Sequence, residues 1–84
     1  MANKDQVYAK IAEAIATAEN DPDKGGEETV VYAVDVVRNF FNIQCDYAYC
    51  GGFDSTGYDI YCYAIAFVTE EGELGLYDYQ YEVY

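Results

Sequence analysis

The sequence contains no histidine, one serine, one proline and only four lysines and arginines, against sixteen aspartates and glutamates. Without histidine, neither a Ser/His nor a Cys/His nucleophile can be assembled around Ser55 or around any cysteine. The three cysteines do not have the spacing of a zinc site, and the glycine pairs lack the lysine of a phosphate-binding loop. We therefore expect a protein that is not an enzyme and that holds no metal and no cofactor.

The scarcity of cations leaves a formal net charge of −12 on 84 residues. Proteins that bind nucleic acid or anionic membranes directly use lysine and arginine to neutralise phosphates, so both ligands are excluded by the sign of the charge. A compact domain with this much like charge repels itself, and it generates a field that attracts a basic partner. A basic protein, including one that itself binds nucleic acid, is the expected partner.

Long apolar segments are also missing. The longest uncharged stretch, residues 60–69, is too short to span a bilayer and alternates like a strand. The odd cysteine count, with Cys45, Cys50 and Cys62, and the lack of an apolar signal segment favour reduced thiols. We expect the protein to be cytoplasmic. If a phage encodes it, the compartment would be the cytoplasm of the host cell.

The residues that are present predict a single globular domain over 1–84 that begins with two helices. Apolar residues recur at helical spacing in a first helix at about 4–19, which Asn3 and Gln6 would start as a capping box. The Asn20-Asp21-Pro22 triplet would end it. A second helix is expected at about 27–41, with Phe40 and Phe41 on its apolar face. A strand is the competing interpretation there, because five valines are β-branched.

After Asn42 the apolar period changes to two, which predicts strands at about 43–50, 58–69 and 74–84. Residues 51–57 would form a glycine-rich turn. The expected fold is α+β, with two helices on one face of a three-stranded antiparallel sheet (ααβββ). We expect small residues of the central strand to face the helices and to pair with large neighbours across the sheet. These residues are Ile60, Cys62, Ala64, Ala66 and Val68.

The side of the sheet away from the helices would then carry carboxylates and exposed aromatic rings together. Side chains two apart on a strand are about 6.6 to 6.8 Å apart, about two rises of one DNA strand, so this face could approximate a phosphate row. Tyrosine is favoured at protein interfaces. The ordinary alternative is a solvated sheet face. The predicted partner-binding residues are Asp46, Asp59, Asp78, Glu82, Tyr61 and Tyr63.

The chain resembles phage-encoded inhibitors of host defence in its small size, strong acidity, aromatic richness and absence of catalytic groups. Such inhibitors include anti-CRISPR proteins, antirestriction proteins and uracil-DNA glycosylase inhibitors. The ααβββ arrangement is most similar to small anti-CRISPR proteins of type I systems. The resemblance lies in charge, length and composition and contains no motif. It implies an inhibitor that mimics DNA charge and occupies the duplex- or PAM-binding channel of a Cas effector subunit.

Two other interpretations fit the same composition. An acidic antitoxin or immunity protein would cover a basic nuclease in the same way. A halophilic or solubility-driven domain would carry excess carboxylates without any basic partner, although it would be expected to have fewer large aromatic residues. The sequence does not fix the identity of the target or the number of copies in solution.

Overall fold

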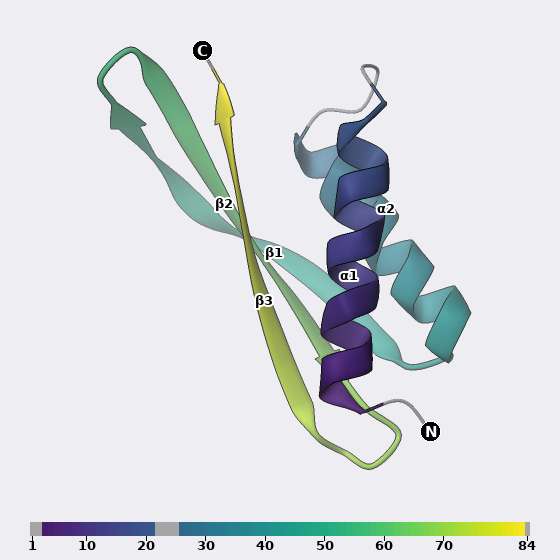
Figure 1. The fold of residues 1–84 in the computed structure, drawn as a ribbon. Helices are drawn as coiled ribbons and strands as arrows, with labels where there is room; N and C mark the ends of the chain where they lie inside the picture. Colours follow the sequence, from purple (N-terminus) through teal and green to yellow (C-terminus); the bar gives the residue numbers. More distant parts are fainter. Residues whose placement is uncertain (1–2, 22–25, 84) are drawn as a thin grey trace.

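The computed structural model describes residues 3–21 and 26–83. This part of the chain forms two helices, α1 (Lys4–Glu19) and α2 (Gly26–Phe41), followed by three strands. The strands are β1 (Gln44–Ser55), β2 (Tyr58–Val68) and β3 (Leu74–Val83), and they form one antiparallel sheet in the order β1-β2-β3. Both helices lie on the same side of this twisted sheet (Figure 1). The predicted ααβββ fold is confirmed.

Helix α1 forms as its sequence predicts. The Asn3 side chain accepts the Gln6 backbone N–H at 2.9 Å and the Gln6 side chain accepts the Asn3 N–H at 3.0 Å, which completes the capping box. The helix ends at Asn20, whereas Pro22 lies outside the described residues. The buried side chains are those of the predicted apolar stripe, Val7, Ile11, Ala14, Ile15 and Ala18.

Helix α2 confirms the helical interpretation of the valine-rich segment. Helical spacing buries Val30, Val34 and Val37 against the rest of the core and leaves Asp35 exposed. In a strand, alternation would place Asp35 on the same face as Val37. The prediction that Phe40 lies on the apolar face is wrong. Its side chain is 64% exposed, and the Lys10 ammonium lies 4.1 Å from its ring centroid. The Phe40 ring therefore makes a cation–π contact at the surface of the helix and does not pack in the core.

The prediction for the central strand is also wrong, because β2 turns its other side to the helices. Tyr63, Ile65 and Phe67 are buried, while Cys62, Ala64 and Ala66 face away. Ala64 therefore pairs with Ala48 and Asp78, and not with the large neighbours that the sequence predicted, because β2 is shifted by one residue. Large side chains remove more apolar area from water than alanines do, so the register that buries them is favoured.

Gly75 makes this register sterically possible. It pairs with Phe67 across the sheet, and a Cβ atom at Gly75 would overlap the Phe67 ring. The Phe67 ring therefore occupies the space that a side chain on β3 would fill. Tyr8 of α1 packs edge-on against this ring, with centroids 5.2 Å apart, and so joins the helix layer to the sheet.

Strand β1 extends beyond its predicted end at Cys50 and continues to Ser55. The glycines at 51 and 52 do not form the hairpin turn. Instead, the register shifts between Tyr49 and Gly51, and Gly51 has φ +115°, a value that favours glycine. The turn consists of Thr56 and Gly57, with φ +85° at Gly57, between the paired residues Ser55 and Tyr58.

Candidate partner-binding surface

The structure divides the six predicted binding residues between the two sides of the sheet. We call the side that faces the helices the inner face, and the opposite side the outer face. The outer face of the described strands comprises Gln44, Asp46, Ala48, Ile60, Cys62, Ala64, Ala66, Val68, Leu74, Leu76, Asp78, Gln80 and Glu82. Asp46, Asp78 and Glu82 lie there as predicted. Asp59, Tyr61 and Tyr63 alternate onto the inner face, so the predicted site is not one surface.

Tyr63 belongs to the core and not to a binding surface. It is 8% exposed, and its ring centroid lies 6.1 Å from that of Tyr81 and 5.3 Å from that of Tyr49. Burial raises the pKa of the Tyr63 hydroxyl to about 12, and burial likewise raises the pKa of Tyr79 to about 12. Tyr61 is half-buried and stacks on Tyr81 at 5.3 Å.

The first turn of α2 covers part of this tyrosine cluster. The Tyr47 hydroxyl donates a hydrogen bond to a Glu27 carboxylate oxygen at 3.0 Å, and this bond is the main cause that raises the pKa of Tyr47. The Tyr81 ring lies directly against Gly26, where a Cβ atom would overlap it. The tyrosines that composition indicated as interface residues are thus used largely to attach the sheet to α2.

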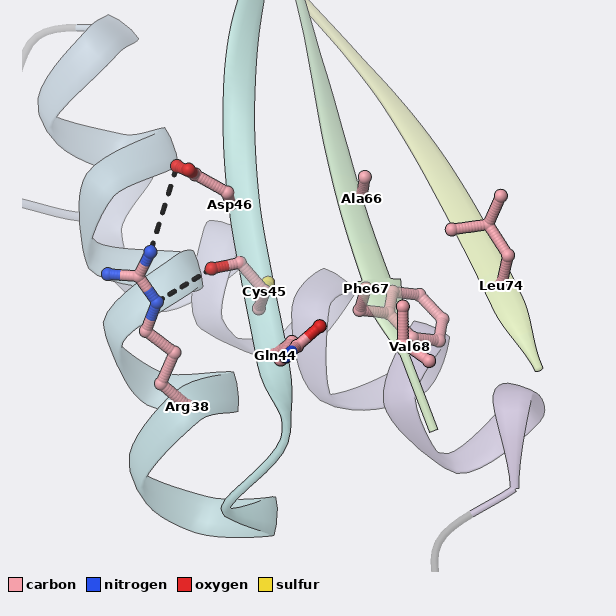
Figure 2. A pocket seen from close by; sticks show the side chains of 8 residues that line it. All are labelled: Arg38, Gln44, Cys45, Asp46, Ala66, Phe67, Val68 and Leu74. Carbon is pink, nitrogen blue, oxygen red and sulfur yellow. Dashed lines mark hydrogen bonds and ion pairs between the residues drawn. The ribbon is translucent and has the colours of Figure 1, made fainter. Parts of the chain in front are cut away.

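The outer face has an apolar centre with acidic positions around it. Across the strands, Asp46 pairs with Ala66 and then Leu76, and the next row pairs Ala48, Ala64 and Asp78. A hollow of about 430 Å³ lies at the end of this face near Leu74 and Val68, with Ala66 and Asp46 among its lining residues (Figure 2). The alanine side chains of β2 extend only a short distance from the sheet, so the longer side chains on β1 and β3 project beyond them.

Two exposed leucines enlarge the apolar centre. Leu74 is 67% exposed and Leu76 is 58% exposed, both on β3. They are not among the binding residues that the sequence predicted. The signal was available in the alternation of β3, which places both leucines on the face of Asp78, and contiguous exposed apolar residues rimmed by polar ones mark interaction sites.

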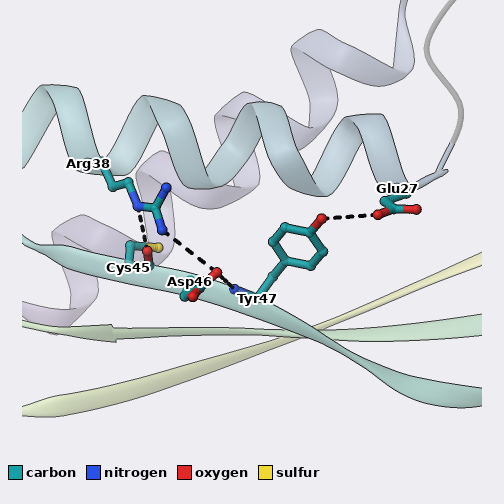
Figure 3. Close-up of polar contacts among 5 residues, drawn as sticks. All are labelled: Glu27, Arg38, Cys45, Asp46 and Tyr47. Carbon is teal, nitrogen blue, oxygen red and sulfur yellow. Dashed lines mark hydrogen bonds and ion pairs between the residues drawn. The ribbon is translucent and has the colours of Figure 1, made fainter.

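The carboxylates of the outer face differ in their electrostatic surroundings. Asp46 is compensated, because its Oδ1 lies 3.7 Å from an Arg38 guanidinium nitrogen (Figure 3). Asp78 is exposed on β3 and has no cation partner among the described residues. Asp46 and Asp78 lie on the two outer strands and in neighbouring rows, so at least two strand spacings, about 10 Å, separate them. They therefore cannot share a proton as an acid–base pair.

Two cations of the helices, Lys10 and Arg38, are already engaged. Lys10 pairs with Glu13 at 3.3 Å and contacts the Phe40 ring, and Arg38 binds β1. Exposed carboxylates such as Asp5, Asp35 and Glu70 extend the negative charge over the helices and the β2–β3 loop. The net charge of −12 therefore extends over the helices as well as the outer face.

No helix among the described residues is long and apolar enough to cross a membrane. Within the same residues, no group of three or more histidine, cysteine, aspartate or glutamate side chains is arranged to hold a metal ion. Comparisons with protein family models, curated proteins and solved structures found no match to this chain.

Proposed function

We propose that this protein is a phage-encoded inhibitor that occupies the basic nucleic-acid-binding site of a host defence protein. It binds through charge that imitates DNA, and it blocks target DNA from the same site. A type I Cas effector subunit is the first target to test, because the compositional resemblance is to anti-CRISPR proteins of that class. The reduced cysteines indicate a cytoplasmic protein, and such a target also operates in the cytoplasm.

The observation that carries this proposal is uncompensated charge beside an exposed apolar surface. The net charge is −12, and Asp78 is exposed with no cation partner within residues 3–21 and 26–83. Leu74 and Leu76 are exposed on the same face of the same strand. Charge attracts and orients a basic partner, and apolar contact then slows its dissociation. A domain selected for solubility alone does not need two exposed leucines on the same face of one strand.

Carboxylate spacing supports the DNA-mimic part of the proposal. Asp78 and Glu82 lie on one strand and one face, about 13 Å apart along the strand. That separation corresponds to about four rises of one DNA strand. The two carboxylates can therefore meet lysines or arginines that are spaced to bind phosphates about four nucleotides apart on one DNA strand.

The test is a competition experiment with purified type I Cas effector complexes and a labelled target duplex. Addition of this protein should release the duplex, and raising the salt concentration should weaken the inhibition. The variant Asp78→Lys should inhibit about tenfold less well, since a repulsive charge replaces an attractive one at the contact.

Asp35→Lys is the matched control, because it changes the net charge equally on the exposed side of α2. A small loss with Asp35→Lys and a large loss with Asp78→Lys would support the outer face. Equal losses would assign inhibition to overall charge and contradict the outer face. If neither Cas effectors nor restriction complexes are inhibited, the same competition against basic nucleases tests the antitoxin or immunity interpretation.

A further inference from the structure

The free edge of β3 has backbone groups that point away from the sheet. The Leu76 N–H donates to the Tyr8 hydroxyl of α1 at 3.1 Å, so it is not bonded to β2. In an antiparallel ladder, residues alternate between bonding the neighbouring strand and pointing away from it. The N–H and C=O groups of Asp78 and Gln80 therefore also point outward. No described residue outside the sheet bonds to either of them.

The opposite edge of the sheet, on β1, is closed by three features. The Arg38 Nε–H donates to the Cys45 carbonyl at 2.6 Å, and the Asp46 carboxylate accepts the Tyr47 N–H at 2.8 Å (Figure 3). The register shift between Tyr49 and Gly51 then interrupts the strand. Proteins commonly protect edge strands with such bonds and bulges, because an open edge invites another strand.

Strand β3 lacks these protections beyond Leu76. It runs for 10 residues, pairs with β2 without a register shift and contains neither proline nor lysine. Its outer-face side chains in this half are Asp78, Gln80 and Glu82, all exposed. The edge is therefore regular, accessible and acidic.

The charge of the edge selects its occupant. A second copy paired antiparallel about Gln80 would place Asp78 opposite Glu82 of that copy, in addition to the repulsion between two chains of −12 each. Like charges directly opposite across strands are destabilising, whereas opposite charges attract. The suitable occupant is an extended segment with lysine or arginine at alternate positions.

We propose that β3, from Asp78 to Glu82, binds a basic extended segment of the partner protein as a fourth strand of the sheet. Backbone hydrogen bonds to Asp78 and Gln80 would hold the segment, and its alternate cations would meet the outer-face carboxylates. This inference rests on the proposed function and specifies which part of a basic partner is recognised.

The test uses a capped synthetic peptide that alternates lysine and valine as the probe. Gln80→Pro removes an outward N–H without removing a bond to β2, so the sheet should tolerate it, as edge strands do. Gln80→Thr is the matched control, because it changes the same side chain and keeps the N–H. We expect Gln80→Pro to weaken peptide binding by about tenfold and Gln80→Thr to leave it unchanged.

Hydrogen exchange provides a second measurement on the unaltered protein, which holds even if Gln80→Pro fails to fold. Bound peptide should slow exchange of the Asp78 and Gln80 amides, and a peptide N-methylated at alternate residues should not. Equal binding by both peptides, or binding without protection of these amides, would overturn the inference. Either result leaves the proposed function standing if duplex competition is still observed. Loss of competition with every basic target would instead reject the proposed function.

Discussion

The two faces of the sheet are built by the same three strands but carry opposite kinds of side chain. The inner face buries Ile65 and Phe67 beneath the helices, while the outer face places Ala64 and Ala66 at its centre. On β2, the large residues lie where packing stabilises the fold, and the small ones lie where the sheet is open. Substitutions on the inner face should therefore change stability, and those on the outer face should change binding.

The largest difference between the two faces is expected when one large residue on each face is truncated to alanine. Phe67→Ala should lower the free energy of unfolding by about 3 to 5 kcal/mol, because it leaves a cavity in the core. Leu76→Ala should change it by less than about 0.5 kcal/mol, because that side chain is already 58% exposed. Denaturant unfolding measures both, and similar losses would show that the outer face also contributes packing energy.

A smaller effect is expected from adding a methyl group to the inner face. Gly75→Ala should destabilise by about 1 to 3 kcal/mol, since the buried Phe67 ring occupies the space of the new Cβ. Combining it with Phe67→Leu should cost less than the sum of the two single changes, because the smaller side chain leaves room. Additive losses would indicate that the two positions do not compete for space.

Alkaline pH should affect the inner face without any substitution. The pKa values of Tyr63 and Tyr79 are raised from 10.0 to about 12, so the folded state holds these protons more tightly than the unfolded chain. Their contribution to stability is complete below pH 10.0 and is lost as the pH rises toward about 12. Denaturant unfolding over this range, followed with tyrosinate absorbance, should show the loss. Stability that stays constant over the range would contradict the burial of both hydroxyls.

The thiols give the mildest test, with no expected change in stability at neutral pH. Cys45 is buried on the inner face, and desolvation raises its pKa from 9.0 to about 11. Cys50 is exposed. An alkylating reagent should modify Cys50 first and Cys45 only as the protein unfolds, since the thiolate is the reactive form. Mass mapping of modified peptides would show the order.

Local signals predicted the elements well and the sheet register poorly. The capping box at Asn3 and the apolar stripe of α1 depend on residues three or four apart, so sequence spacing defines them. Both faces of β2 are largely apolar, so alternation alone could not decide which one meets the helices. The decision depends on Gly75 opposite Phe67, a contact between strands that only the folded sheet brings together.

The candidate site was predicted in part for the same reason. Asp46, Asp78 and Glu82 reach the outer face because β1 and β3 alternate as expected. Tyr61 and Tyr63 were assigned to the wrong side by the one-residue error in β2. The bond from Arg38 to β1 joins a helix to a strand, and no sequence spacing indicates it.

The Arg38 guanidinium donates a hydrogen bond to the Cys45 carbonyl at the β1 edge. This bond limits the size of any assembly that forms by adding strands to the sheet. A sheet that can add strands at both edges can propagate into a filament, whereas Arg38 occupies a backbone acceptor at the β1 edge and so disfavours a new strand there. Any complex built by extension of the sheet should accordingly stop at one guest per molecule. A highly acidic chain with aromatic strands can in this way stay discrete at high concentration.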